Sequence, residues 1–365
     1  MRVWKSGRYQ APVIRRVHIP KGNGKLRPLG ITTMEDRVVQ KAVAWVLSAV
    51  FEQNFLNGSH GFRPNRSPHT ALHRLRQGIL RNWARYVVEV DVVGFFDAVN
   101  WTWLRKFVRH RVNDGGVMGL LNKWLKAGVM ENGVVTLSDE GVPQGGPVSP
   151  VLSNIYLHYV LDLWFERRFK KSCRGYAELT RFADDFVVAF KYHEDAMRFR
   201  EEMEERLQAF GLRIAPEKTA LRCFDANLLK RGGRRQRKPD TFAFLGFTHY
   251  LAKARSGTLN IMLKPTVKAR ERFIRSMHDW LTANKHLDVR EQHTHLVKAL
   301  QGYYQYFGLR LCSRYLNGVR QRVRKLWRVV LRRRSQRAKH RTDWESLLAK
   351  PWFQLPVGRV TQAWI

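Results

Sequence analysis

Acidic residues, cysteines and long apolar runs are all scarce in this 365-residue chain. Lys and Arg outnumber Asp and Glu by 66 to 30, which gives a formal net charge of +36. So large an excess argues against a general cytosolic enzyme and predicts a polyanionic partner, held largely through phosphates and released by salt. An anionic membrane is disfavoured as that partner, because no apolar run reaches about 18 residues and the N-terminus has no signal-peptide pattern.

Cysteine is too sparse to shape the fold. The three cysteines, Cys173, Cys223 and Cys312, are far apart and odd in number. They exclude a disulfide framework and a Cys-x-x-Cys zinc site, so any metal must bind to oxygen ligands. We therefore expect a cytoplasmic protein, in a bacterial-type cytosol or nucleoid.

The apolar content, 44% hydrophobic and 12% aromatic, is enough for a folded protein of two or three domains. Strand-like residues 13–20, a Gly-rich turn and a return strand at 26–31 predict a hairpin, and an amphipathic helix follows through residues 38–47. Residues 86–210 alternate short strands with helices, which predicts an α+β domain of the split βαβ, ferredoxin-like type. From about Lys264 the pattern is helical and strongly basic.

Two acidic clusters carry the chemistry. Asp91 ends an apolar strand, and Asp184 and Asp185 lie between apolar residues at the tip of a predicted strand–turn–strand. Burying like charges side by side is costly unless cations compensate, so we interpret the three carboxylates as ligands of divalent metal. A pair of Mg²⁺ ions, with Mn²⁺ as a substitute, would activate a 3′-hydroxyl and stabilise departing pyrophosphate. The structural alternative is a strand cap at Asp91 and an ordinary turn at the Asp pair.

These residues stand in sequence blocks that resemble those of group II intron-encoded reverse transcriptases. The run Phe182-Ala183-Asp184-Asp185 is similar to the Tyr-Ala-Asp-Asp box of that family, and further matching blocks follow the family order at 19–31, 61–67, 94–97, 141–150, 216–219 and 244–247. The resemblance implies an RNA-directed DNA polymerase with right-hand architecture. Its parts would be fingers at 1–85, a catalytic palm with the remaining fingers elements at 86–262, and a basic helical thumb or maturase domain at 263–365.

The resemblance also implies roles for single residues. The incoming nucleotide would be held or positioned by Lys21, Arg27, Arg63, Phe96, Gln144 and Lys218, with Phe96 blocking a 2′-hydroxyl. Primer and template would contact Leu245, Gly246, Phe247 and Arg66. Residues 320–341 hold eleven Lys or Arg and no acid, whereas a merely solvated helix would mix signs. The thumb would therefore bind RNA through Arg320, Arg324, Lys325, Arg328, Arg332, Arg333 and Arg334.

Ordinary structural roles are the alternative at each of these positions: a solvated basic hairpin, surface ion pairs, core rings and glycine turns. The chain also departs from the family in three ways. Phe182 replaces the usual Tyr of the box, the N-terminal extension is expected to be missing or nearly so, and no Cys-pair His-Asn-His nuclease domain follows the thumb. DNA cleavage in cis is therefore not expected.

The predicted function is primer extension with dNTPs on an RNA template, together with binding of group II intron RNA and assistance to splicing. A DNA target is a further candidate partner, and the oligomeric state stays open. Two alternatives remain: a maturase that binds intron RNA without needing polymerisation, and a domesticated reverse transcriptase that serves host defence.

Overall fold

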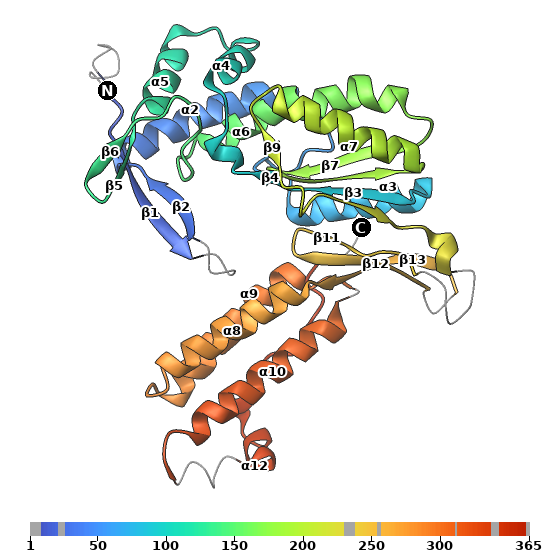
Figure 1. Cartoon of the computed structure of the whole chain (residues 1–365). Helices are drawn as coiled ribbons and strands as arrows, with labels where there is room; N and C mark the ends of the chain where they lie inside the picture. The colour runs from blue at the N-terminus through green and yellow to red at the C-terminus, as the bar shows by residue number, and fades with distance from the viewer. Residues whose placement is uncertain are drawn as a thin grey trace. The chain divides into compact units, whose positions relative to one another are not determined.

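The computed structural model describes residues 9–20, 26–229, 238–253, 257–310, 312–336 and 343–362. The chain divides into two compact units, Met1–Asp240 and Thr241–Ile365, which differ in architecture (Figure 1). Helices and mostly antiparallel sheets occur together, which confirms the predicted α+β class. No helix among the described residues is long and apolar enough to cross a membrane. Lys21 lies outside these residues, as do residues 337–341 of the basic run.

A four-stranded sheet in the order β2-β1-β5-β6 opens the N-terminal unit. Its strands are β1 (Ile14–Pro20), β2 (Leu26–Ile31), β5 (Val129–Glu131) and β6 (Val134–Thr136). The antiparallel pairing of β1 with β2 confirms the predicted hairpin. Helix α2 (Met34–Glu52) follows and begins at Thr33, whose side chain accepts a hydrogen bond from the Asp36 N–H group.

A second, antiparallel sheet in the order β10-β3-β8-β7 forms the centre of this unit. Its strands are β3 (Tyr86–Val90), β7 (Ala177–Phe182), β8 (Asp185–Phe190) and β10 (Ala220–Cys223). Helix α3 (Pro68–Asn82) packs against β7 and β8, and α7 (His193–Gln208) packs against β3 and β8. Just beyond β3, the short strands β4 (Val92–Val93) and β9 (Arg213–Ile214) pair with each other. Strand β8 is buried over most of its length, so its register is set by packing.

Among the described residues, two π-helical turns accompany the remaining helices of the N-terminal unit, which are α-helical or 3₁₀-helical. They are η1 (Phe95–Asp97), α4 (Trp101–Arg109), α5 (Gly115–Leu125), α6 (Ser149–Leu157), η4 (Lys170–Ser172) and η5 (Ala226–Leu229). After α6 the chain continues in π-helical turns at η2 (His158–Asp162) and η3 (Phe165–Phe169). Such i→i+5 turns are rare and are often found at functional sites.

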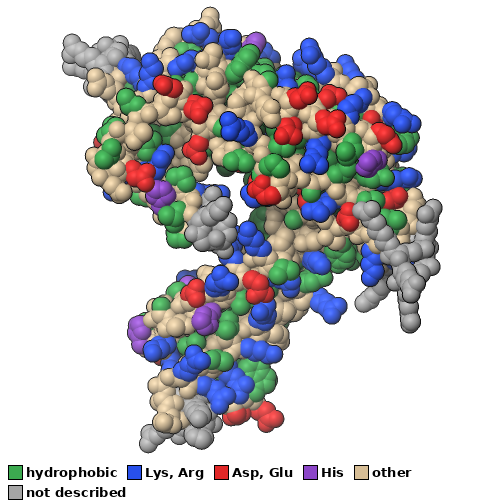
Figure 2. Space-filling model, viewed as in Figure 1, with side chains coloured by type: hydrophobic (Ala, Val, Ile, Leu, Met, Phe, Trp, Pro, Cys, Tyr) green, Lys and Arg blue, Asp and Glu red, His purple; other side chains and the backbone are tan. Residues whose placement is uncertain are grey.

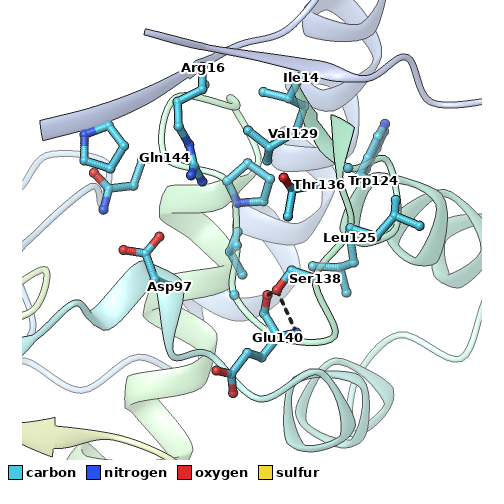
Figure 3. Close-up of a pocket in the computed structure, with 17 residues that line it drawn as sticks. Ile14, Arg16, Asp97, Trp124, Leu125, Val129, Thr136, Ser138, Glu140 and Gln144 are labelled. Atoms are coloured by element: carbon cyan, nitrogen blue, oxygen red, sulfur yellow. Dashed lines mark hydrogen bonds between the residues drawn. The ribbon is translucent and has the colours of Figure 1, made fainter. Parts of the chain in front are cut away.

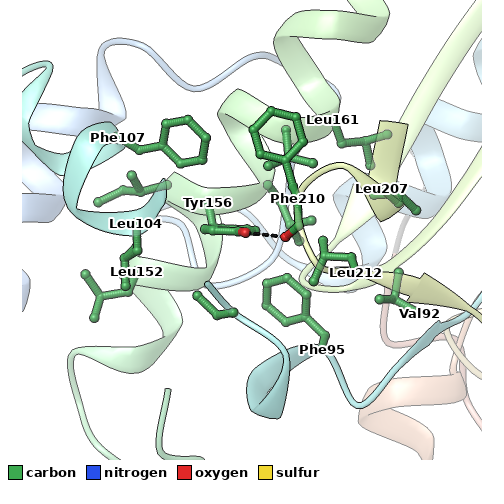
Figure 4. Close-up of a cluster of buried hydrophobic side chains, with 14 of the residues drawn as sticks. Val92, Phe95, Leu104, Phe107, Leu152, Tyr156, Leu161, Leu207, Phe210 and Leu212 are labelled. Atoms are coloured by element: carbon green, nitrogen blue, oxygen red, sulfur yellow. Dashed lines mark hydrogen bonds between the residues drawn. The ribbon is translucent and has the colours of Figure 1, made fainter. Parts of the chain in front are cut away.

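The core of this unit is rich in aromatic side chains (Figure 4). Tyr156 is fully buried, and its hydroxyl donates a hydrogen bond of 2.6 Å to the Phe210 carbonyl. Phe95 packs edge-on against Tyr156, with ring centroids 6.4 Å apart. Phe95 is therefore a core residue, as the alternative for this ring predicted. The packing anchors η1, which begins four residues after Asp91, just beyond β4.

The C-terminal unit joins a small sheet to long helices. Strands β11 (Phe242–Phe244), β12 (Phe247–Lys253) and β13 (Leu259–Pro265) pair antiparallel, and the helices are α8 (Val267–Ala283), α9 (Val289–Phe307), α10 (Ser313–Arg332), α12 (Trp344–Leu348) and η6 (Pro351–Phe353). Trp327 of α10 is buried and stacks on Phe353, with ring centroids 5.0 Å apart. The predicted palm–thumb border at 262/263 falls inside β13, whereas the two compact units divide at 240/241. The division into fingers, palm and thumb stays a prediction.

Candidate active site

The three predicted metal ligands converge where β3 and β8 lie side by side. The register of this antiparallel pair joins Val90 to Phe186, so Asp91 follows β3 opposite Asp185, the first residue of β8. Asp184 lies in the two-residue turn between β7 and β8, next to Ala183, whose φ of 58° is unusual for a residue with a side chain. Residues 93 apart in the sequence are thus brought to one sheet edge.

Negative charge is concentrated at this edge. Removal from water, and then the carboxylates of Asp184, Asp91 and Glu89, raise the pKa of Asp185 to about 7. Asp185 reaches the surface, so solvent weakens this rise in its pKa. The three neighbouring carboxylates still act to raise the pKa. Burial also raises the pKa of Asp184, and Asp91 adds to this, while the charges of Arg27 and Arg181 oppose it. A cation bound between these carboxylates would relieve their repulsion.

The donor set fits a hard divalent cation that keeps some of its water. Among the described residues, no group of three or more Asp, Glu, His or Cys side chains is arranged so that it could hold a metal ion by itself. Mg²⁺ is usually bound by one or two carboxylates together with water and substrate phosphates, so it does not require three protein ligands. The carboxylates of Asp91, Asp184 and Asp185 would supply the protein's share of the ligands.

Lys218 brings a positive charge to the same cluster. Its ammonium group donates a hydrogen bond to the Asp91 carboxylate, and this bond raises the pKa of Lys218. The lysine is held in a turn after β9, where its N–H donates to the Ala215 carbonyl at 3.0 Å and the Ala215 N–H donates to the Asp91 carbonyl at 2.8 Å. Its exposed side chain would be able to move from Asp91 to a phosphate.

Backbone hydrogen bonds connect the segments that carry the predicted nucleotide-binding residues Phe96 and Gln144. The Val142 N–H donates to the Phe96 carbonyl, and the Gly30 N–H of β2 donates to the Gln144 carbonyl, both at 2.6 Å. Gly145 follows with a φ of 119°, and a Cβ there would lie 2.3 Å from the Gly30 carbonyl oxygen. This position therefore requires glycine, and β2 is tied directly to the loop that carries Gln144.

A pocket of about 380 Å³ lies beside this loop (Figure 3). It opens between β1, β5, β6 and the loop at 140–144. Polar side chains lining it are Arg16, Asp97, Thr136, Ser138, Glu140 and Gln144, and none of the three predicted metal ligands lines it. This pocket is therefore separate from the carboxylate cluster, which lies at the sheet edge.

The Arg63 side chain is bound within the N-terminal unit. Its guanidinium is buried and binds the Glu52 carboxylate at 2.7 Å, and it also donates to the carbonyls of Leu56, Ser59 and Phe55. All of its donors are thereby used, as the ion-pair alternative expects, and the predicted nucleotide contact of Arg63 stays a prediction. Arg66 is partly exposed and donates to the Asn57 side chain at 3.0 Å.

The predicted primer-grip residues form a tight hairpin turn in the C-terminal unit. Leu245 and Gly246 have φ values of 49° and 78° and connect β11 to β12. The Tyr306 hydroxyl of α9 donates to the Leu245 carbonyl at 2.9 Å, and the fully buried Phe247 packs on Tyr306 and Phe307. Phe247 is therefore a core residue, and Gly246 is the exposed part of the turn.

The basic helix α10 divides its cations between interior and surface. Arg320 donates to the Leu355 carbonyl at 2.8 Å, and Arg324 is buried with a bond of 3.2 Å to Gln354. Arg328 lies over the Trp344 ring, and Arg334 donates to the Leu287 carbonyl. Lys325, Arg332 and Arg333 are exposed. Figure 2 shows Lys and Arg spread over the visible face of this unit with few acidic side chains between them.

Two charged residues near the cluster were missed by reasoning from the sequence. Glu89 lies two residues before Asp91, and the period of two in a strand places both on one face, which was a usable signal. Arg181 lies three residues before Asp184 and is completely buried. Its partners are distant in sequence, so no local pattern indicated it.

Comparison with known proteins adds relatives to this geometry. Residues 19–249 match the family described as reverse transcriptase (RNA-dependent DNA polymerase). Protein YkfC of Escherichia coli (strain K12) is 35% identical over 296 residues, which are 73% of this chain and 74% of that protein. Group II intron-encoded protein LtrA of Lactococcus lactis subsp. cremoris is 42% identical over 164 residues, 44% of this chain and 27% of LtrA. The putative COX1/OXI3 intron 1 protein of Saccharomyces cerevisiae is 30% identical over 201 residues, 52% of this chain and 24% of that protein.

Proposed function

This chain belongs to the reverse transcriptase family and is an RNA-directed DNA polymerase of the group II intron type, and we propose that Asp91, Asp184 and Asp185 are its catalytic carboxylates. The observation that carries the proposal is the β3–β8 register, which sets Asp91 opposite Asp185 and beside the Asp184 turn. The charge of Arg27 also acts on Asp184, so a fingertip cation and the carboxylates lie in one region. Proteins of this family generally use divalent metal ions.

In this proposal each side chain has a defined task. Two Mg²⁺ ions, which Mn²⁺ can replace, would be held by the three carboxylates and would lower the pKa of a primer hydroxyl and neutralise charge on the leaving pyrophosphate. Arg27 binds the triphosphate with Lys21. Lys218 transfers its hydrogen bond from Asp91 to a phosphate and can donate a proton there. Phe96 occupies the space a 2′-hydroxyl would need, and Gln144 orients the nascent base pair.

The same chain would bind the RNA of a group II intron and assist its splicing. Support comes from the net charge of +36, the exposed cations of α10 and the intron proteins among its relatives. Binding of this kind depends on phosphate contacts and weakens as salt rises. We propose a bacterial-type cytosol as its location, because two of its relatives, YkfC and LtrA, are bacterial proteins.

Primer extension tests the polymerase proposal. Purified protein with Mg²⁺, dNTPs and a primed RNA template should extend the primer, and Asp184→Asn should reduce the rate at least about a thousandfold, because a lost metal ligand removes several kcal/mol of transition-state stabilisation. Template–primer affinity should stay within about twofold. Asp139→Asn, which changes an exposed acid outside the cluster, is the matched control.

Two results would contradict the proposal: no incorporation by wild-type protein with either metal, or full activity in Asp184→Asn. An intron-splicing assay with the same variant separates the two functions. If RNA binding alone supports splicing, Asp184→Asn should splice at the wild-type rate while it fails to polymerise.

A further inference from the structure

Arg181, the last but one residue of β7, is an arginine with no exposed surface. An arginine side chain has five N–H donors, and here each one has an acceptor. Nε and one Nη2 hydrogen bind the two Asp162 oxygens at 2.8 and 2.6 Å, and the other Nη2 hydrogen binds Ser59 Oγ at 2.8 Å. Nη1 binds Asn154 Oδ1 at 3.1 Å and the Ala183 carbonyl oxygen at 2.8 Å.

The bond to Ala183 connects this network to the active site. Ala183 is the residue of positive φ in the β7–β8 turn, and the next residue is Asp184. A residue with a Cβ in this conformation is strained, so the surrounding contacts must hold it. One Nη1 hydrogen of Arg181 does so directly. No other side chain in the network bonds the backbone of the Asp184 turn.

The loop at 58–61 closes on the same turn from outside the sheet. The Arg181 N–H donates to the Gly58 carbonyl and the His60 N–H donates to the Arg181 carbonyl, both at 2.8 Å. The Asn154 amide donates to the Gly61 carbonyl at 2.7 Å. A Cβ at Gly61 would lie 2.2 Å from the Ala183 nitrogen, so loop and turn are in backbone contact. Arg181 and Asn154 therefore fasten both sides of the turn.

The π-helical segment η2 supplies the carboxylate for Arg181. In a regular α-helix, residues eight positions apart are rotated by about 80° from each other, so Asp162 would point away from Asn154. The i→i+5 turn of η2 absorbs about one extra residue and brings Asp162 back towards the Asn154 face. Both side chains are buried and both bond Arg181. The π-helical turn therefore allows Asp162 and Asn154 to bond the same arginine.

Stability alone does not explain a buried ion pair at this place. Two apolar side chains of similar volume often serve a core equally well or better, because removing both charges from water is costly. What apolar side chains cannot do is donate to the Ala183 carbonyl, Ser59 and Asn154 in fixed directions. A lysine has three donors and no fork, so it cannot replace this pattern.

We propose that Arg181 is a positioning residue, which holds the Ala183–Asp184 turn so that Asp184 faces Asp91, and that it thereby sets the metal affinity and the turnover rate. The inference rests on the proposed catalytic carboxylates. It acts through Asp184, since Arg181 is too deeply buried to touch substrate.

The test compares Arg181→Lys with a matched control, Arg206→Lys. Arg206 of α7 also bonds η2, through the Val160 and Tyr159 carbonyls, but neither of these bonds reaches Asp162 or the turn. Mn²⁺ binding is measured by electron paramagnetic resonance without substrate, and kcat and dNTP KM are measured by primer extension. Loss of a group that orients a metal ligand typically costs 10–100-fold. We expect Arg181→Lys to weaken Mn²⁺ binding and lower kcat by at least about tenfold, with KM nearly unchanged, and Arg206→Lys to change neither.

A double variant separates positioning from folding. Arg181→Met with Asp162→Leu removes both charges while keeping apolar volume, so it should unfold at a temperature near or above that of Arg181→Lys. If it also keeps weak Mn²⁺ binding and low kcat, positioning is supported. Recovery of wild-type Mn²⁺ binding and kcat in the double variant would overturn the inference, as would an Arg181→Lys protein that binds Mn²⁺ normally. Failure of the polymerase proposal itself would show differently, as a wild-type protein without extension activity.

Discussion

Arg181 in the N-terminal unit and Lys325 in the C-terminal unit both carry a positive charge, but their surroundings are opposite. Arg181 has no exposed surface and gives all five donors to acceptors within its unit. Arg63 repeats this pattern one loop away. Lys325, Arg332 and Arg333 are exposed on or just after α10. One set of cations fixes backbone positions, and the other set is available to a polyanion.

The difference shows that net charge overstates the surface available for RNA. Along α10, Arg320 and Arg324 bond the segment around Gln354 and Leu355, so they fasten the C-terminal residues to the helix. The sequence-based set of seven RNA-binding residues therefore contains members that already have structural partners. We expect the exposed three to contribute most of the salt-dependent binding.

The largest effect should follow from filling the space between the buried loop and the catalytic turn. Gly61→Val would place side-chain atoms against the Ala183 backbone, where even a Cβ lies 2.2 Å from the nitrogen. We expect a loss of unfolding free energy above about 3 kcal/mol in urea titrations, together with loss of primer extension. Gly302→Ala on α9 is the control, because a Cβ there meets no described atom within 4 Å, and it should gain about 0.5–1 kcal/mol. Equal urea midpoints for Gly61→Val and wild type would contradict this contact.

Removing an interior cation should cost stability without changing RNA affinity. Arg63→Met leaves Glu52 and three carbonyls without their donor, although Glu52 is partly solvated. We expect a loss of about 2–3 kcal/mol of unfolding free energy, less than for a fully buried pair. RNA affinity, measured by filter binding, should stay within about twofold. If RNA binding by this variant depended less on salt than that of wild type, Arg63 would contact RNA, which would contradict its interior role.

Acid should destabilise the N-terminal unit because burial, aided by interior cations, keeps His158 neutral in the folded protein. Burial lowers the pKa of His158 to about 4, against the attraction of Asp162 and with repulsion from Arg181, Arg167 and Arg63. The unfolded chain takes up this proton near pH 6.5 and the folded chain does not, so stability present above pH 6.5 is lost as pH falls towards 4. We expect a loss of about 1–2 kcal/mol between pH 6.5 and 5 from this residue. In thermal melts, His158→Leu should flatten that part of the profile, and an unchanged slope would refute the assignment.

Replacing the exposed cations Lys325, Arg332 and Arg333 should have the smallest effect on folding and the clearest effect on RNA binding. The triple variant Lys325→Gln, Arg332→Gln, Arg333→Gln should lower the slope of log affinity against log salt by about 2, since each single-strand phosphate contact contributes about 0.7. Its melting temperature should match wild type. The triple variant Lys268→Gln, Arg272→Gln, Arg275→Gln on α8 is a comparison with equal charge loss on another exposed helix face. If both variants lose the same slope, the basic surface acts as a whole and α10 has no special role.

The β1–β2 hairpin and much of the catalytic edge were predictable from the sequence, because their signals are local. Strand-like residues 13–20 and 26–31 flank a Gly-rich turn, and an Asp at the end of an apolar run indicates a strand end. The strand–turn–strand around the Asp pair was predicted for the same reason, with Asp184 in the turn and Asp185 as the first residue of β8. The role of Asp91, Asp184 and Asp185 as metal ligands stays a prediction, which the primer-extension and Mn²⁺-binding experiments test.

The hydrogen-bond network around Arg181 was not predictable, because it depends on contacts between residues that are distant in sequence. Ser59, Asp162 and Asn154 are 122, 19 and 27 residues away from Arg181. Nothing in the sequence shows which of many arginines faces inward. The partners of Arg63 are nearer in sequence, but Glu52 and the three carbonyls meet its guanidinium only when the loop after α2 has folded.

The extra residue in η2 makes the polymerase sensitive to insertion at a place far from its substrates. One more residue between Asn154 and His158 would leave every named side chain unchanged, yet each residue added to a helix turns those after it by about 100°, so Asp162 would leave the Asn154 face. Arg181 would then be buried without its counter-charge. Deleting one residue within His158–Asp162 would instead restore the regular period, with Asp162 seven positions after Asn154 and still on its face. A longer segment would thus act like a substitution in the core, whereas a segment one residue shorter would keep the ion pair.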